Sequence, residues 1–305
     1  MHRPAGPTFA VIGAAKAATS SMYEYLRAHP EVFMSPVKET NFFALNGAPP
    51  SFRGPGDDAG INRHSIWRAE DYAALFSGAG MAPSVRARGE ASPLYLYDEH
   101  APVAVAAHGG IKAVAILRHP VERAYAAWLH KRRDGLEPLD DFASALNEER
   151  ARRAAGWEFV WHYEAVGHYP EQLQRWFTAV GRENVYVLLQ EDLEGAGADV
   201  LARVFDFIGV DSSFEVDTSQ RYNPSGEVRS AALQQALTHG RGVRALARRL
   251  VPAGARERVH RRLSAANLRK PEMSAATRAD LLARYAADVD VLESMLNRDL
   301  GSWRV

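Results

Sequence analysis

Short apolar segments alternate with segments of helical period over the first two thirds of this 305-residue chain, and this alternation constrains the fold more than any other feature. The apolar runs, each of a length suited to a strand buried on both faces, lie at 9–12, 31–34, 85–90, 111–117 and 185–189. A strand that is followed by a helix and then by another strand usually returns parallel to the first. The alternation therefore predicts an α/β fold with a mostly parallel central sheet flanked by helices on both faces.

The last quarter of the chain has a helical pattern only, and Ser274 can cap a final helix whose apolar residues recur at helical spacing. We expect one domain over 1–305, made of an α/β core over 1–225 and a helical extension over 226–305. Residues 226–270 carry eleven Lys and Arg against two Glu, although the whole chain has no net formal charge. This stretch is either a solvated helical face or a basic wall beside an anionic ligand.

The first strand leads into a turn with one lysine and then into a helix whose first residues carry hydroxyl groups. Gly13 allows a sharp turn, Lys16 could reach back over it, and the Thr-Ser-Ser run at 19–21 could cap the helix. A helix N-terminus has unpaired N–H groups and a dipole that favours anions. These residues alone favour equally a plain turn and a cradle for phosphate or sulfate. The lysine spacing differs from that of the nucleotide-hydrolase loop G-x-x-x-x-G-K-[ST].

Two further pairs of polar residues stand close to strand ends. Lys38 and Glu39 are adjacent and precede two phenylalanines, which taken alone indicates a charged loop ahead of the core. Glu90 ends the third predicted strand and Ser92 follows it, at the edge where open α/β sheets bind ligands.

A second candidate anion site lies after the fourth predicted strand. Arg118 ends that strand beside a helix N-terminus, so it could bind an anion or pair with a carboxylate such as Glu122. The stretch 46–65 is rich in Gly, Pro, Asp and Asn, and it predicts a long irregular loop of the kind that often serves as a lid.

The composition excludes several classes of function. Zero net charge gives no overall attraction to nucleic acid or anionic membranes, and no apolar run is long enough to span a membrane. The absence of cysteine excludes disulfides, thiolate metal sites and cysteine nucleophiles, and the spacing of the eleven histidines does not indicate a metal site. No secretion signal is recognisable at the N-terminus. We therefore expect a cytoplasmic protein that binds no nucleic acid and does not insert stably into membranes.

Three stretches taken together resemble the sulfotransferases that use 3'-phosphoadenosine 5'-phosphosulfate (PAPS). Residues 13–22, Gly-Ala-Ala-Lys-Ala-Ala-Thr-Ser-Ser-Met, are similar to the family's 5'-phosphosulfate loop, G-x-x-K-x-G-T-[TS]-S-L. Residues 118–126 resemble its 3'-phosphate motif, R-[ND]-P-x-x-R-A-x-S. Residues 38–43, Lys-Glu-Thr-Asn-Phe-Phe, resemble the K-E-x-x-F-F element of the Golgi heparan sulfate branch. Weaker similarities at 89–93, 167–173 and 297–303 extend the match along nearly the whole chain.

The resemblance implies a P-loop-kinase-like sulfotransferase fold and transfer of a sulfuryl group from PAPS to a hydroxyl of a small-molecule, lipid or glycan acceptor, with PAP as product and no metal. It makes Lys16, Lys38 and Glu39 the catalytic residues, with Lys16 neutralising the leaving group and Glu39 as general base. It implies a cofactor-binding set of Gly13, Ala15, Lys16, Ala17, Ala18, Thr19, Ser20, Ser21, Arg118 and Ala126. It places the acceptor beside Asn41, Phe43, Glu90 and Ser92. A glutamate buried beside phenylalanines would have a raised pKa, and Lys38 would lower the pKa of Glu39 again.

Three residues depart from the family pattern. Ala18 stands in place of the loop glycine, and we expect φ below zero there. Ala126 stands where a serine usually binds the 3'-phosphate, so Arg118 would carry more of that site. Ala91 occupies the place of a lysine in the glycosaminoglycan 3-O-sulfotransferases, which weakens the case for a polysaccharide acceptor.

Two other functions stay open from the sequence. One is a non-catalytic module that binds PAP or anionic glycans through the basic stretch. The other, less favoured, is a nucleotide-dependent kinase, which would need a standard phosphate loop and Mg²⁺ ligands that the sequence does not provide.

Overall fold

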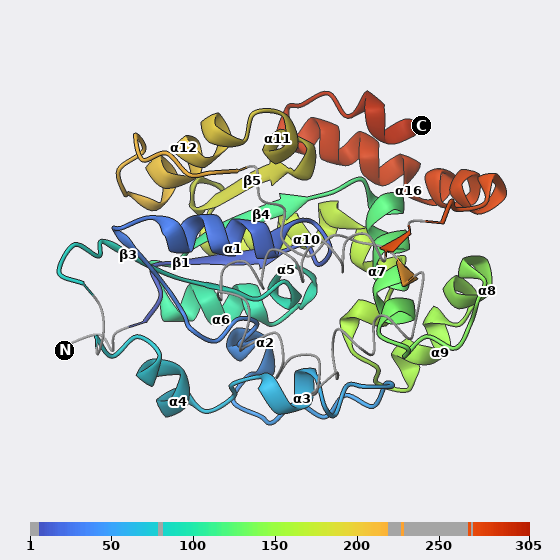
Figure 1. Ribbon diagram of the computed structural model, residues 1–305, viewed down its shortest axis with the longest axis horizontal. Helices are drawn as coiled ribbons and strands as arrows, with labels where there is room; N and C mark the ends of the chain where they lie inside the picture. The colour runs from blue at the N-terminus through green and yellow to red at the C-terminus, as the bar shows by residue number, and fades with distance from the viewer. Residues whose placement is uncertain (1–5, 79–81, 219–226, 229–267, 270) are drawn as a thin grey trace, which may run out of the picture.

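The computed structural model describes residues 6–78, 82–218, 227–228, 268–269 and 271–305 (Figure 1). Its elements in chain order are β1 (Phe9–Gly13), α1 (Thr19–Ala28), β2 (Val32–Met34), α2 (Phe42–Leu45), α3 (Ile61–His64), α4 (Ala69–Ala74), β3 (Ala87–Ala91), α5 (Leu94–Tyr97), α6 (Ala101–His108), β4 (Lys112–Leu117), α7 (Pro120–Arg133), α8 (Phe142–Asn147), α9 (Glu149–Ala154), η1 (Phe159–Trp161), η2 (Ala165–Gly167), α10 (Tyr169–Val180), η3 (Arg182–Asn184), β5 (Val185–Leu189), α11 (Gln190–Gly195), α12 (Gly197–Ile208), β6 (Glu227–Val228), β7 (Leu268–Arg269), α16 (Ala275–Leu296) and η4 (Gly301–Arg304).

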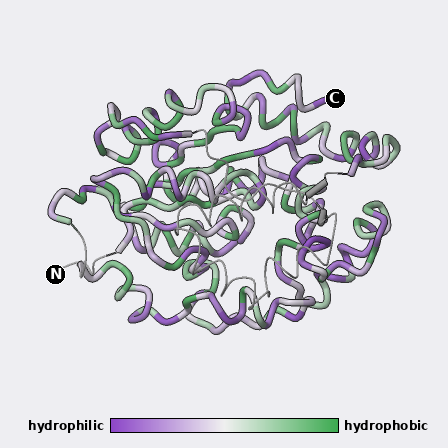
Figure 2. Tube along the Cα trace, viewed as in Figure 1, coloured by the Kyte–Doolittle hydropathy of each residue, from purple (hydrophilic) through white to green (hydrophobic). Residues whose placement is uncertain are grey.

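The predicted parallel sheet is confirmed. Its five strands run parallel in the order β2-β3-β1-β4-β5, with helices around them (Figure 1). The central strand β1 is buried along its whole length, and Ala10 lies opposite Glu90 on one side and Ala113 on the other. Figure 2 shows hydrophobic residues along these strands. Because the strands are parallel, the carboxyl ends of β1, β3 and β4 meet at one edge, where ligands bind in such sheets.

One glycine in the sheet is required by packing. A Cβ atom on Gly89 would lie 2.1 Å from the ring of Phe9. Glycine at this position of β3 therefore lets the Phe9 side chain of β1 pack directly against the neighbouring backbone.

The C-terminal helix α16 packs on the rest of the molecule through the face expected from the sequence. Ser274 caps the helix by accepting a hydrogen bond from the Thr277 N–H at 3.1 Å. The buried residues of α16 include Leu281, Tyr285 and Val289. Two of these, Leu281 and Tyr285, join a second hydrophobic cluster with residues of α7 and α8, separate from the cluster around the sheet.

Two details of the secondary structure differ from the prediction. The helices-only pattern after residue 225 is wrong at Glu227–Val228 and Leu268–Arg269, which pair as short antiparallel strands. The rest of the basic stretch lies outside the described residues, and the division at residue 225 stays a prediction. The helix expected over 165–180 is interrupted at His168, because Pro170 lacks an N–H and fits only the first turn of a new helix. Within the described ranges, no helix combines the length and apolar character needed to span a membrane.

Candidate active site

The loop between β1 and α1 has an unusual backbone. Gly13 has φ 150°, and a Cβ atom there would lie 2.7 Å from Cβ of Leu96, so the turn needs glycine. Lys16 and Ala18 are both left-handed, with φ of 69° and 64°. The expectation of a negative φ at Ala18 is wrong, because the chain enters α1 through a left-handed N-cap residue even without glycine there.

The N-terminus of α1 carries no side-chain cap. Ala18 is the N-cap residue, and its side chain makes no capping hydrogen bond. The expected hydroxyl cap is therefore wrong, because residues 19–21 lie within the first turn instead of ahead of it. The first N–H groups of an α-helix have no acceptor within the helix, which suits an anion. Ala15 and Ala17 are buried, so only their backbone could face a ligand.

Arg118 at the end of β4 contacts this loop. Its Nη1 donates to the carbonyl of Lys16 at 3.0 Å, and its own carbonyl accepts from the hydroxyl of Tyr169 at 2.8 Å. Its Nη2 lies 3.9 Å from Glu122, whose carboxylate also accepts from Arg278 of α16. Arg118 thus pairs loosely with Glu122 and also lies against the loop, and its binding of an anion stays a prediction. Ala126, two turns into α7, is buried.

Lys16 is partly buried and stands among several charges. Burial, together with the nearby Arg133 and Arg118, lowers the pKa of Lys16 to about 8, although Asp134 and Glu39 act in the opposite direction. Neighbouring cations that destabilise a protonated lysine make the site favourable for an anion.

The segment 38–39 contacts the start of α1, next to the loop that follows β1. Lys38 Nζ donates to the Ser20 hydroxyl at 2.6 Å and lies 3.2 Å from Oε1 of Glu39. The structure therefore brings the lysine, the carboxylate and the start of α1 together, as the resemblance implies. The Glu39 side chain is 51% exposed, so the expectation that it is buried is wrong. Phe43 takes the buried position instead, with its ring edge-on to those of Tyr72 and Tyr95.

The residues predicted to touch the acceptor lie deeper than expected. Glu90 and Ser92 are fully buried, and Asn41 and Phe43 nearly so. All four lie in a layer of hydrogen bonds and ring contacts joined to the Lys38–Glu39 segment. Direct contact between these residues and an acceptor stays a prediction.

Sequence reasoning missed the end of α7. Burial, Lys16 and Arg133 together lower the pKa of His130 to about 2, and Arg133 donates to His130 Nδ1 at 2.7 Å. Asp134 lies 3.6 Å from the same nitrogen. The signal was present, because positions 130 and 133–134 follow Ala126 at helical spacing and share its face.

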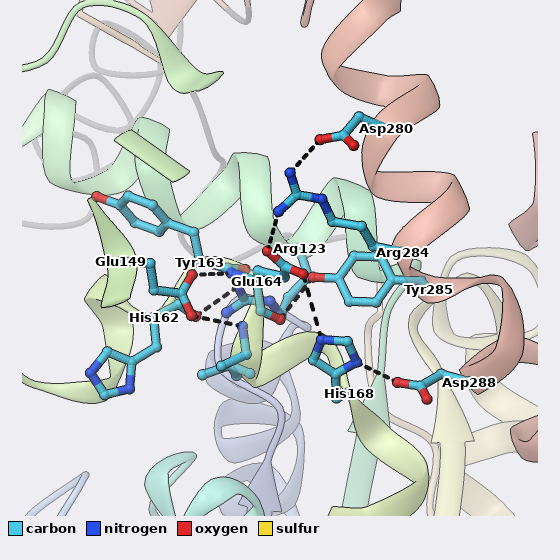
Figure 3. Close-up of polar contacts among 12 residues, drawn as sticks. Arg123, Glu149, His162, Tyr163, Glu164, His168, Asp280, Arg284, Tyr285 and Asp288 are labelled. Carbon is cyan, nitrogen blue, oxygen red and sulfur yellow. Dashed lines mark hydrogen bonds and ion pairs between the residues drawn. The ribbon is translucent and has the colours of Figure 1, made fainter. Parts of the chain in front are cut away.

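The second arginine of the 118–126 stretch is structural. Arg123 is fully buried, and its Nη2 donates to the carbonyls of Tyr163 and His162, the latter at 3.5 Å. The Glu149 carboxylate accepts the N–H groups of Glu164 and Ala165 at 2.6 and 3.0 Å (Figure 3). Arg123 and Glu149 together therefore hold the turn at residues 162–165 in place. This turn leads to Tyr169, whose hydroxyl donates to the Arg118 carbonyl.

The same turn is joined to α16. His168 Nδ1 lies 2.5 Å from Asp288, and Arg284 bridges Glu164 at 2.7 Å and Asp280 at 2.6 Å (Figure 3). Among the residues that the structure describes, no group of three or more metal-ligating side chains is gathered as a metal site.

An anion-suited loop after the central strand of a parallel sheet defines a class of α/β proteins that bind phosphate or sulfate groups. A sulfotransferase from Alicyclobacillus acidocaldarius, known from its crystal structure, is 32% identical and matches with a TM-score of 0.76 over 98% of this chain and 99% of that one. The chain belongs to the sulfotransferase family.

Two human proteins are also similar in sequence. Heparan sulfate glucosamine 3-O-sulfotransferases 3B1 and 3A1 from Homo sapiens are each 26% identical over 208 residues. These residues are 67% of this chain but 46% and 44% of the human proteins, so the chain spans less than half the length of either. No family model matches the chain.

Proposed function

We propose that this protein transfers a sulfuryl group from PAPS to a hydroxyl group of a small-molecule, lipid or glycan acceptor by in-line displacement. One observation carries the proposal: the Lys38 ammonium lies between the Ser20 hydroxyl and the Glu39 carboxylate, so an anion-suited loop and a basic group meet. In the transfer, the acceptor oxygen bonds to sulfur while the bond from sulfur to the 5'-phosphate oxygen breaks. PAP leaves with the electron pair, and the acceptor loses its proton.

The residues of the site fit PAPS in charge. The α1 N-terminus and Lys16 would hold the phosphosulfate end, with Thr19, Ser20 and Ser21 close to it, and Arg118 would hold the 3'-phosphate. The fit rests on the position of Arg118, which donates to the Lys16 carbonyl at 3.0 Å, and on a Lys16 pKa that burial and the neighbouring Arg133 and Arg118 lower and that a bound anion would raise. Ala126 has no hydroxyl group, so among the residues of this motif Arg118 alone would bind the 3'-phosphate. These cations supply the charge neutralisation that Mg²⁺ gives in kinases, and we propose a metal-independent reaction.

Glu39 acts as general base in this proposal. A positioned base accelerates such a step by roughly 10²- to 10⁴-fold. The carboxylate is half-exposed, so an acceptor hydroxyl can approach it, and Lys38 holds it on the side of Ser20. Lys16 offsets the negative charge that develops on the leaving phosphate.

The acceptor is the open part of the proposal. Similarity to heparan sulfate glucosamine 3-O-sulfotransferases favours a sugar hydroxyl, whereas Ala91 in place of the lysine of that branch favours a small molecule or glycolipid. A cytoplasmic location stays a prediction from the sequence.

The proposal is tested by incubating the protein with ³⁵S-labelled PAPS and a panel of phenolic, sugar and lipid hydroxyl acceptors. We expect label in at least one acceptor and an equal amount of PAP. If the protein binds PAP but no acceptor leads to formation of PAP from PAPS, the protein is a non-catalytic binding module instead.

A further inference from the structure

The segment that carries Glu39 is conformationally strained. Thr40 stands between two left-handed residues, with φ of 61° at Glu39 and 54° at Asn41. This conformation is unfavourable for most residues other than glycine, and less so for asparagine. Strain of this kind persists only where the surrounding structure holds it.

A buried carboxylate lies beneath this segment. Glu90, at the carboxyl end of β3, is fully buried and accepts hydrogen bonds from four hydroxyl groups. The donors are Thr40 at 2.5 Å, Tyr72 at 2.6 Å, and Ser92 and Tyr95 at 2.8 Å each. Each of the four hydroxyl groups donates to an oxygen of Glu90, so the carboxyl group fixes the direction in which each hydroxyl points.

The oriented hydroxyls hold the strained backbone. Since Ser92 and Tyr95 donate to Glu90, their oxygens are free to accept N–H groups. Ser92 Oγ accepts from the Asn41 N–H at 3.1 Å, and the Tyr95 oxygen accepts from the Phe43 N–H at 3.3 Å.

Backbone bonds complete the hold. The Glu39 N–H donates to the Ala91 carbonyl at 2.9 Å, and the Thr40 carbonyl accepts from the Ile66 N–H at 2.8 Å. Residues 39, 40, 41 and 43 are therefore bonded to the end of β3, to the cluster around Glu90 or to the backbone of Ile66.

We propose that Glu90 is a positioning residue that, acting through Thr40, Ser92 and Tyr95, holds Glu39 in its left-handed conformation facing Lys38. The inference rests on the proposed function, in which Glu39 is the general base. A base displaced by about 1 Å can lose roughly 10²-fold in rate.

The test compares Thr40→Val, which keeps the shape and removes the hydroxyl, with Thr40→Ser, which keeps the hydroxyl. Tyr72→Phe removes a second donor and serves if the valine variant does not fold. The control is Tyr285→Phe, which removes a buried hydroxyl bonded to the Glu164 carbonyl, away from the cluster. All are assayed for kcat with ³⁵S-labelled PAPS and an acceptor that the wild type sulfates, and for PAP affinity by calorimetry.

We expect Thr40→Val and Tyr72→Phe to lower kcat by about 10- to 100-fold with unchanged PAP affinity. Thr40→Ser restores kcat, and Tyr285→Phe loses stability but keeps kcat. Unchanged kcat in Thr40→Val would overturn the inference.

A crystal structure of Thr40→Val with PAP separates this inference from the proposed function. We expect Glu39 to leave its left-handed conformation there, and a φ still near 61° would count against positioning by Glu90. If the wild type sulfates no acceptor of the panel, the proposed function fails, while the φ angle at Glu39 still decides this inference.

Discussion

Lys16 combines partial burial with cationic neighbours, which together bring its pKa to about 8. A bound anion would raise this pKa. PAP binding should therefore take up a proton when the pH is above the pKa of Lys16 in the free protein. At about pH 9 roughly nine tenths of free Lys16 is neutral, and PAP should bind about tenfold more weakly than at about pH 7. Calorimetric titration at both pH values measures this difference.

The matched variant for this measurement is Lys16→Arg. A guanidinium stays charged across this range, so the PAP affinity of Lys16→Arg should not change between the two pH values, even if it is weaker overall. An equal loss of affinity in both proteins would show that another group titrates.

Ala18 lies in the left-handed region, where glycine has no Cβ to crowd the backbone. Ala18→Gly should therefore raise the free energy of unfolding by about 0.5–1 kcal/mol, after the greater flexibility of the unfolded glycine chain is deducted. The neighbouring Ala17 is fully buried and does not have positive φ, so Ala17→Gly should lower stability. Urea denaturation distinguishes the two, and equal destabilisation by both would contradict the assigned φ at Ala18.

At the scale of elements, His168 links the start of α10 to α16. Hydrogen bonding to Glu164, and then to Asp288, raises the pKa of His168 above its ordinary value of 6.5. A raised pKa means that the contribution to stability is complete below pH 6.5 and is lost as the pH rises through the folded-state pKa.

His168→Gln should therefore lower stability at about pH 6 and have less effect at about pH 9. The difference should stay under about 1 kcal/mol, because solvent screens a side chain that is more than one third exposed. Thermal unfolding at the two pH values measures it. His64→Gln, which loses only a contact with its own helix, is the control, and an equal pH dependence in both variants would remove His168 from the clamp.

The glycine-rich stretch 46–65 is attached to η1 through one buried carboxylate. Asp57 accepts the N–H groups of Gly54 at 2.7 Å and Glu158 at 2.9 Å, and the indole N–H of Trp161 at 3.2 Å. Asp57→Ala should lower the free energy of unfolding by about 2 kcal/mol and speed proteolysis within this stretch, because buried donors lose their acceptor. Asp57→Asn keeps one acceptor oxygen and should be milder. Unchanged cleavage in Asp57→Ala would show that other contacts attach the stretch.

At the scale of the whole molecule, the features that depend on residues close together in the sequence could be predicted from it. The strands, the turn at Gly13 and the cap at Ser274 follow from apolar runs, a turn residue and a capping residue that each stand within one short stretch.

Features that depend on distant residues could not be predicted in this way. Glu90 is buried among four hydroxyl groups, and the segment that carries the exposed Glu39 lies over this cluster. The four hydroxyl groups come from separate positions, so no single stretch of sequence contains the cluster. The left-handed Ala18 likewise reflects the path of the loop and not the preference of alanine.

The central claim is that Glu39 takes the acceptor proton at a site where PAP binds independently of it. Glu39→Gln should bind PAP as tightly as the wild type while its turnover with ³⁵S-labelled PAPS falls by about 10²- to 10⁴-fold. Glu171→Gln, at an 82% exposed side chain paired with Arg175, should keep both properties. Turnover preserved in Glu39→Gln would contradict the account.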